Sequence, residues 1–323
     1  KIYRKFANQV IPTFYKINTN KMAIPNSQLE TWSRQGSITQ SASTYASIKN
    51  ALEHDSAGYT SRNFEVFLQG SYGNDTNIYS ESDVDVVIRY DGAFYHDLTE
   101  LPPEQLTLFH QTMSDGTYPY DDFKNHAKNA LIKAFPMSVV HGKKAIRINE
   151  NGTRRSADVI PAFGFRRYYR FNGSGDHNQS YDEGICFWTP DGKRIINYPK
   201  KHSANSTAKH QSTSYNFKPL VRIFKNIRTK LVDDGSIGKD IGPSYFIEGL
   251  LYNAPNELFR GTYQDMVANI LRWFQNASLV DRAKFVCVND QYYLFHDSES
   301  VCWPQKNAIE FVTAFQKLSD NWR

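Results

Sequence analysis

Every second residue is apolar in two segments of the first half of the chain, at 64–68 and 82–90. A period of two places these residues on one face of a strand, so both segments are expected to be strands. The segment between them, 72–82, is polar and rich in turn-forming residues, which predicts a loop. A hairpin is expected further on, because two short strand-like segments, 144–148 and 153–160, flank an Asn-Glu-Asn-Gly turn.

Apolar residues at helical spacing dominate the rest of the chain. Residues 27–54 are expected to form one long helix, with Gly36 as a point where it can break. A short hairpin is expected at 284–295. The other segments with a helical pattern are 121–135, 219–232, 243–253, 263–276 and 307–319. This order predicts an α+β first half and a helical second half, with a boundary between about 165 and 215.

Composition restricts the class of protein. The chain has 323 residues, of which 40% are hydrophobic and 22% charged, with 21 Phe and 20 Tyr, and this excludes intrinsic disorder. No run approaches the roughly 18 apolar residues that a membrane helix needs, and the first residues lack the apolar core of a secretory signal. Three scattered cysteines suit neither a disulfide framework nor a metal cluster. We therefore expect a cytoplasmic protein without a membrane partner.

Positive charge is concentrated in one segment. The net charge is +5, yet residues 193–230 contain ten Lys or Arg and no Asp or Glu, so the rest of the chain carries −5. A run of this kind is either a solvated face or a binding site for a polyanion such as a nucleoside triphosphate. The second interpretation predicts that these cations contact phosphate.

Paired carboxylates give the sharpest chemical signal. Asp83 and Asp85 lie two residues apart on an expected strand, so both project from the same face. A divalent cation would neutralise such a pair, and a third acid, Asp158, lies near the end of another expected strand. Three carboxylates on adjacent strands suit two-metal phosphoryl transfer. Taken alone, an Asp-x-Asp pair is also common on surface strands.

A Gly-Ser pair ends the strand that precedes these acids. Gly70 would let backbone amides approach a phosphate closely, and the Ser71 hydroxyl would add a donor. The pair by itself could be an ordinary turn, but a strand, Gly-Ser, a loop and then Asp-x-Asp is a much rarer order.

Segment 69–76 (QGSYGNDT), followed by 82–88 (SDVDVVI), resembles the signature of the polymerase-β-like nucleotidyltransferase superfamily. Within it, the chain most resembles the bacterial cGAS/DncV-like nucleotidyltransferases, relatives of cyclic GMP-AMP synthase and oligoadenylate synthetase. The resemblance covers about 30–320, and 31–37 (TWSRQGS) and 252–255 (YNAP) are similar to the clade E-like branch. Later segments that resemble the family in the same order are 157–161 (ADVIP), 184–187 (GICF), 221–225 (VRIFK), 243–248 (PSYFIE) and 251–255 (LYNAP).

The resemblance implies an α+β fold in which a polymerase-β-like sheet and a C-terminal helical lobe enclose one active-site cleft. Residues 1–55 would be an N-terminal helical region packing across both lobes, 56–200 the catalytic core and 201–323 the helical domain. Asp83 and Asp85 would hold two Mg²⁺ ions, with Mn²⁺ as an alternative. Asp158 would bind the ion that lowers the pKa of the attacking ribose hydroxyl. The residues expected to bind nucleotide are Gln69, Gly70, Ser71, Thr76, Lys225, Ser244 and Tyr245.

Several of these residues have a second interpretation. The polar face of helix 219–232, which includes Lys225, is either solvated or in contact with the triphosphate. Ser244 either meets phosphate at a helix N-terminus or only caps that helix. Tyr245 either stacks on a base or lies in the core. Glu248 is expected to be structural. Histidines without metal-ligand spacing, expected at surface or lid positions, are His141, His202 and His210. The segment 202–212 is interpreted as a loop.

Three functions remain open at this stage. The first is an enzyme that joins nucleoside triphosphates into a cyclic di- or oligonucleotide second messenger, with release of pyrophosphate, in antiphage defence. The second is an enzyme that adds nucleotides to an RNA or protein acceptor, and the third a nucleotide- or RNA-binding module without catalysis. We expect a monomer that is constitutively active or controlled by a regulatory protein, without an obligatory nucleic-acid activator.

Overall fold

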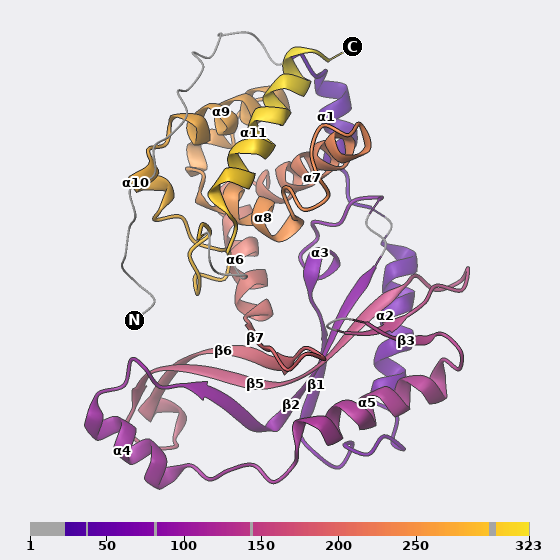
Figure 1. The fold of residues 1–323 in the computed structure, drawn as a ribbon, viewed down its shortest axis with the longest axis vertical. Coiled ribbons are helices and arrows are strands. Elements are labelled where there is room, and N and C mark those ends of the chain that lie inside the picture. Colours follow the sequence, from indigo (N-terminus) through magenta and orange to yellow (C-terminus); the bar gives the residue numbers. More distant parts are fainter. Residues whose placement is uncertain (1–22, 37, 81–82, 143–144, 297–301, 323) are drawn as a thin grey trace.

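The computed structural model describes residues 23–36, 38–80, 83–142, 145–296 and 302–322. It consists of a sheet with flanking helices and of a separate helical lobe that lies over one end of the sheet (Figure 1). This is the α+β architecture expected from the sequence. None of the helices in the described ranges combines the length and the apolar character needed to cross a membrane.

One mixed sheet of seven strands forms the lower part of the molecule, in the order β1-β2-β5-β4-β3, with β6 pairing with β5 and β7 with β6. The strands are β1 (Phe64–Leu68), β2 (Val84–Asp97), β3 (Val139–His141), β4 (Ile146–Ile148), β5 (Ala157–Phe171), β6 (Gln179–Trp188) and β7 (Arg194–Asn197). The two central strands, β2 and β5, are parallel and begin at the same level, since Val84 pairs with Ala157.

The helices fall into two groups. Near the sheet, α2 and α5 pack on one of its faces through a shared apolar core. In the helical lobe, α7 is central and contacts α1, α6, α8 and α11. The helices are α1 (Asn26–Ser33), α2 (Thr39–Leu52), α3 (Gly70–Gly73), α4 (Pro103–Thr112), α5 (Tyr120–Ala134), α6 (Pro199–Ser212), α7 (Phe217–Asp233), α8 (Ser244–Asn253), α9 (Tyr263–Asn276), α10 (Leu279–Arg282) and α11 (Gln305–Asp320), with short 3₁₀ turns η1 (Asp176–Asn178) and η2 (Asn256–Leu258).

The long helix expected at 27–54 is two helices. The chain breaks at Gly36, whose amide donates to the Asn77 carbonyl at 3.0 Å, and a Cβ at Gly36 would lie 2.7 Å from the Ile78 carbonyl group. Only glycine permits this close approach of two backbones. As a result α1 packs on α7 and α9 of the helical lobe, while α2 packs on the sheet. The expected region 1–55 thus contacts both lobes over its described part, and residues 1–22 lie outside the described residues.

Three other expectations about elements differ from the structure. The segment 202–212 is not a loop, because α6 begins at Pro199 and buries His202 and Ser206, four residues apart on one face. The expected hairpin of 144–148 with 153–160 is present as the antiparallel pair β4–β5. Its connection is longer than the predicted turn at 149–152, since the register pairs Ile148 of β4 with Ala157 of β5. The hairpin at 284–295 is reduced to a single bridge between Val286 and Tyr293.

Candidate active site

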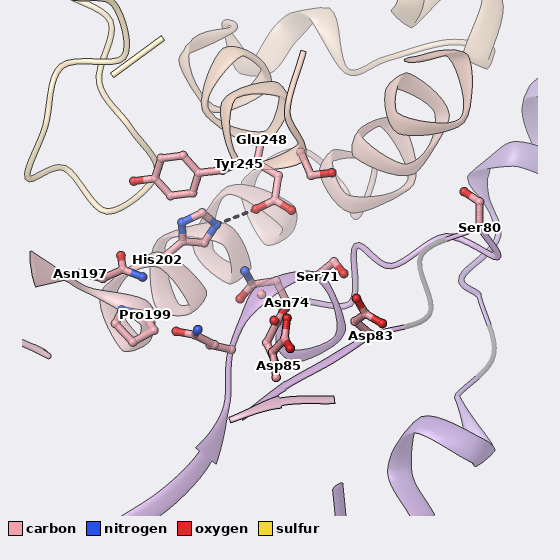
Figure 2. A pocket seen from close by; sticks show the side chains of 14 residues that line it. Ser71, Asn74, Ser80, Asp83, Asp85, Asn197, Pro199, His202, Tyr245 and Glu248 are labelled. Atoms are coloured by element: carbon pink, nitrogen blue, oxygen red, sulfur yellow. Dashed lines mark hydrogen bonds and ion pairs between the residues drawn. The ribbon is translucent and has the colours of Figure 1, made fainter. Parts of the chain in front are cut away.

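A cavity of about 530 Å³ opens between the start of the central strands and helix α8. Figure 2 shows Asp83 and Asp85 on its lower wall and Tyr245 and Glu248 on its upper wall. Eight of the ten predicted site residues line it: Gln69, Gly70, Ser71, Asp83, Asp85, Asp158, Ser244 and Tyr245. The structure therefore brings together segments that lie up to 176 positions apart in the sequence, Gln69 being the first of them and Tyr245 the last.

The sheet register fixes how the three acids lie. Asp85 and Asp158 are direct partners across the parallel pair β2–β5, and Asp83 comes immediately before β2. The Arg147 guanidinium offsets the repulsion between the Asp83 and Asp158 carboxylates. It bonds to Asp83 at 3.2 Å and lies 3.5 Å from Asp158. The sequence analysis did not single out Arg147. Arg147 could be found only from its position in β4, where it pairs directly with Asp158 of β5.

Burial and neighbouring charges act on these groups in opposite directions. Burial raises the pKa of Asp158 above its ordinary value, Arg147 partly offsets this, and Asp83 adds to it. The hydrogen bonds from Arg147 to Asp83 raise the pKa of that guanidinium, which stays charged. Such a set favours a cation at the start of β2 and β5.

The donor set fits Mg²⁺ or Mn²⁺ in chemistry, because both take carboxylate oxygens and Mg²⁺ usually adds substrate phosphates and waters rather than a full protein cage. In the described part of the chain, however, no three His, Cys, Asp or Glu side chains converge on one ion position. The acids are thus beside one another but are not arranged as a complete ligand set.

Gly70 holds the wall beside Asp85. Its φ is +67°, a left-handed conformation, and a Cβ at this position would overlap the Oδ2 atom of Asp85. The Gln69 amide also donates to the Asp85 carbonyl at 3.0 Å. Glycine is therefore required here both by the backbone conformation and by the carboxylate. Ser71 follows in the short helix α3 and also lines the cavity.

We expect Gly70→Ala to lower activity by about a hundredfold, because a methyl group would displace Asp85. The left-handed φ would add a cost of roughly 1–2 kcal/mol in stability. Gly235→Ala is the matched control, since Gly235 has φ +70° and nothing within 4 Å of its Cβ position. Thermal unfolding and product formation should show similar destabilisation in both variants but lost activity only in Gly70→Ala. Equal activity in the two would contradict the role of Gly70.

Thr76 and Lys225 do not reach the cavity wall, in contrast to the expectation. The Thr76 side chain is fully buried and its hydroxyl donates to Glu248 Oε1 at 2.6 Å. The Lys225 ammonium is also buried and donates to the Thr76 carbonyl at 2.8 Å. Both groups lie behind the wall, so this structure does not show the direct phosphate contact predicted for them.

His202 was expected at a surface or lid position, but the structure buries it. It is buried in α6, lines the cavity, and its Nε2 bonds to Glu248 Oε2 at 2.6 Å (Figure 2). Glu248 thus bridges α6 and the Thr76 loop from α8, which agrees with the expected structural role. Burial by itself raises the pKa of Glu248, but the hydrogen bond and charge of His202, with Lys225 and Thr76, lower it below its ordinary value.

Ser244 and Tyr245 both lie at the first turn of α8, and Pro243 precedes the helix as its cap. The Tyr245 ring packs near the His202 ring, with centroids 5.5 Å apart, and its hydroxyl accepts a hydrogen bond from Asn289 at 3.1 Å. The ring is partly buried and also lines the cavity. Tyr245 therefore combines both interpretations: its ring packs against the core and also lines the cavity.

The basic segment 193–230 is used mainly inside the protein. Lys218 pairs with Asp75 at 2.9 Å, and Arg222 donates to the carbonyls of Ser33 and Asp75. Both cations therefore hold the segment between β1 and β2 against the helical lobe. Other members of the segment have protein partners too, namely Lys200, Lys201, Lys209, Arg228 and Lys230. Much of the positive charge of this segment is therefore paired within the protein.

Comparison with known proteins identifies relatives over most of the chain. Residues 204–320 match the family model of the cGAS/DncV-like nucleotidyltransferase C-terminal helical domain. The chain is 38% identical over 303 residues to the cyclic UMP-AMP synthase of Rhodothermus marinus, covering 93% of this chain and 99% of that protein. It is 36% identical to a cyclic dipurine nucleotide synthase of Elizabethkingia meningoseptica, covering 85% and 91%.

The fold agrees with solved structures of such relatives. The Rhodothermus marinus CdnE c-UMP-AMP synthase superposes with a TM-score of 0.81 at 35% identity, covering 93% of this chain and 97% of that one. The Elizabethkingia meningoseptica CdnE cyclic dinucleotide synthase superposes with a TM-score of 0.72 at 31% identity, covering 91% and 98%. The expected fold class, a nucleotidyltransferase sheet with a C-terminal helical domain, is confirmed.

Proposed function

The chain belongs to the cGAS/DncV-like nucleotidyltransferases, and we propose that it uses Asp83, Asp85 and Asp158 to join nucleoside triphosphates into a cyclic dinucleotide for bacterial antiphage signalling. It is a nucleotidyltransferase of the cyclic nucleotide synthase type. The observation that carries the proposed site is the register of the central strands. It sets Asp85 beside Asp158, with Asp83 one position before β2, at the floor of the cavity that all three line.

The reaction has two equivalent steps. A ribose hydroxyl of one nucleotide attacks the α-phosphorus of the other, so a phosphodiester bond forms, the bond to the β-phosphate breaks and pyrophosphate leaves with its electron pair. The same exchange in the opposite direction closes the ring. Two Mg²⁺ ions, or Mn²⁺ in their place, would lower the pKa of the attacking hydroxyl and neutralise charge on the leaving pyrophosphate.

The residues of the chain divide this work by position. Asp85 and Asp158 hold the floor at a fixed separation, because they are paired across two strands. Ser71 and Ser244 face the cavity from opposite lobes, where both hydroxyls can donate to a triphosphate. Gln69 and Gly70 shape the wall next to Asp85, and Tyr245 offers a ring on which a base can stack.

The setting of the enzyme is also part of this proposal. The three cysteines are all buried, which suits a reducing cytoplasm, where nucleoside triphosphates are available. We propose a monomer whose activity is constitutive or controlled by a protein partner, without an obligatory nucleic-acid activator. The domain division at residues 55 and 200 belongs to the proposal too, supported by the two groups of helices.

Incubation of the purified protein with all four nucleoside triphosphates and Mg²⁺, followed by mass spectrometry, tests the function. We expect a cyclic product that resists phosphatase, with two pyrophosphates released per ring. Products that appear only when RNA or a protein acceptor is added would instead favour transfer to an acceptor. Nucleotide binding without any turnover would favour a binding module.

A further inference from the structure

A single guanidinium occupies the position between two of the three acids. Arg147 lies in β4 directly opposite Asp158 in the antiparallel pair β4–β5. Its Nη1 and Nη2 atoms bond to the two oxygens of Asp83, each at 3.2 Å, and Nη1 lies 3.5 Å from Asp158 Oδ1. The contact follows from the sheet register, so it is part of the fold and not a chance surface encounter.

Both oxygens of Asp83 are engaged in this arrangement. Besides the two bonds from Arg147, the Ser156 hydroxyl donates to Asp83 Oδ1. Over the described residues, no three side chains of the types that ligate metals converge on one point. The Asp83 carboxylate is therefore oriented toward Arg147 and Ser156, and not toward an ion position that it would share with Asp85 and Asp158.

We propose that Arg147 is the counter-ion of Asp83 and Asp158 in the nucleotide-free protein, and that Asp83 must leave Arg147 before it can ligate a divalent ion. This inference rests on the proposed function, since it assumes that the acids bind metal. Arg147 is a positioning residue, which acts through Asp83 and not on the substrate.

Electrostatic repulsion prevents the Arg147 guanidinium and a divalent metal ion from binding Asp83 at the same time. A divalent ion ligated by Asp83 and Asp158 would stand beside a guanidinium already bonded to the same oxygens, and like charges at such distances repel strongly in a partly buried cleft. The Arg147 pair is nevertheless weak enough to exchange, because 37% of the Arg147 side chain and 40% of that of Asp83 remain exposed. Arg147 would thus keep the acids paired until metal and nucleotide arrive together.

Manganese binding to the nucleotide-free protein, measured by electron paramagnetic resonance, tests the inference. Arg147→Ala should bind Mn²⁺ about fivefold more tightly than the wild type, the most that an exposed ion pair commonly contributes. Arg147→Lys keeps the charge but not the bidentate fork, so it should give a smaller gain. Ser156→Ala should also give a small gain. Arg170→Ala, which removes an exposed arginine near the other end of β5, is the control and should bind as the wild type does.

The outcomes separate this inference from the proposed function. If Asp85→Asn abolishes Mn²⁺ binding but Arg147→Ala and Arg147→Lys bind no more tightly than the wild type, the acids bind metal and the inference about Arg147 is overturned. If Mn²⁺ binds to none of the proteins, even with a non-hydrolysable triphosphate added, the proposed metal site itself is wrong. Thermal unfolding gives a second readout, since added Mn²⁺ should raise the melting temperature of Arg147→Ala more than that of the control.

Discussion

Asp85→Asn is expected to lower the rate of cyclic product formation by roughly a thousandfold or more. A metal ligand contributes several kcal/mol of charge stabilisation to the transition state of phosphoryl transfer, and each 1.4 kcal/mol corresponds to a factor of about ten. Asp85 lies in the centre of the floor, paired with Asp158 across the sheet and in contact with the Gly70 wall. The substitution removes the charge but keeps the size of the side chain. Steady-state synthesis with labelled nucleotides measures the effect.

The fold should survive this change. Loss of one acid from a cluster of three reduces repulsion between like charges, so the melting temperature of Asp85→Asn should equal or exceed that of the wild type. Asp122→Asn is the matched control, because Asp122 is an exposed acid in the first turn of α5. It should retain full activity. An Asp85→Asn protein that is folded and still active would show that the carboxylate is not essential to the reaction.

The floor of the site could be read from the sequence because its signals are local. Asp83 and Asp85 stand two positions apart in a strand pattern, and Gly70 and Ser71 directly follow the preceding strand. Such spacings decide the face of a side chain before any tertiary contact forms. Asp158 was predicted from its place near the end of an expected strand at 153–160. The structure places it at the start of β5 instead, and its pairing with Asp85 depends on the sheet register.

The residues that the sequence analysis missed depend on contacts between distant segments. Arg147 meets the acids only through the register of β4 with β5, and a one-residue slip would point it to the other face. His202 was expected at a surface or lid position because it has no metal-ligand spacing, yet it lies on the face of α6 that is buried. No local pattern distinguishes a polar face that meets water from one that meets another lobe.

The basic segment illustrates the same limit. On α7, Leu220 and Ile223 form the predicted apolar stripe, and Lys225 stands away from it. The ordinary interpretation gives such a face to solvent or to a ligand. In the structure this face is an interface, where Lys225 donates to Thr76 and Lys218 pairs with Asp75. Part of this charge, on Lys218, Arg222 and Lys225, therefore serves to join the lobes.

The buried Glu248 is the centre of that joint, and Glu248→Gln is expected to destabilise the protein by about 3 kcal/mol. The carboxylate accepts hydrogen bonds from Thr76 and His202, at 2.6 Å each, and lies near the Lys225 charge. Removal of one partner of a buried charged network leaves the other groups uncompensated, which typically costs 3–5 kcal/mol. The amide keeps some hydrogen bonds, so the low end of that range applies. Urea unfolding measures the difference.

The pH dependence of stability provides a second test of Glu248, because its pKa in the folded protein lies below the ordinary value of 4.5. Between those two pKa values the unfolded chain binds the proton more readily, so stability falls as pH decreases. The contribution of Glu248 is complete above about pH 4.5 and is lost as the pH falls through the lowered pKa. Glu248→Gln should therefore lose less stability than the wild type on acidification from pH 7 to below pH 4.

Glu257→Gln is the control for both measurements, since Glu257 is an exposed acid in the turn after α8. It should match the wild type in unfolding free energy at pH 7 and in acid sensitivity. If Glu248→Gln behaved in the same way, the network would contribute nothing net, as happens when the cost of burying charges cancels their attraction. The lobes would then be held together by apolar packing and by their other polar contacts, among them those of Lys218 and Arg222. The cavity between them would not depend on Glu248.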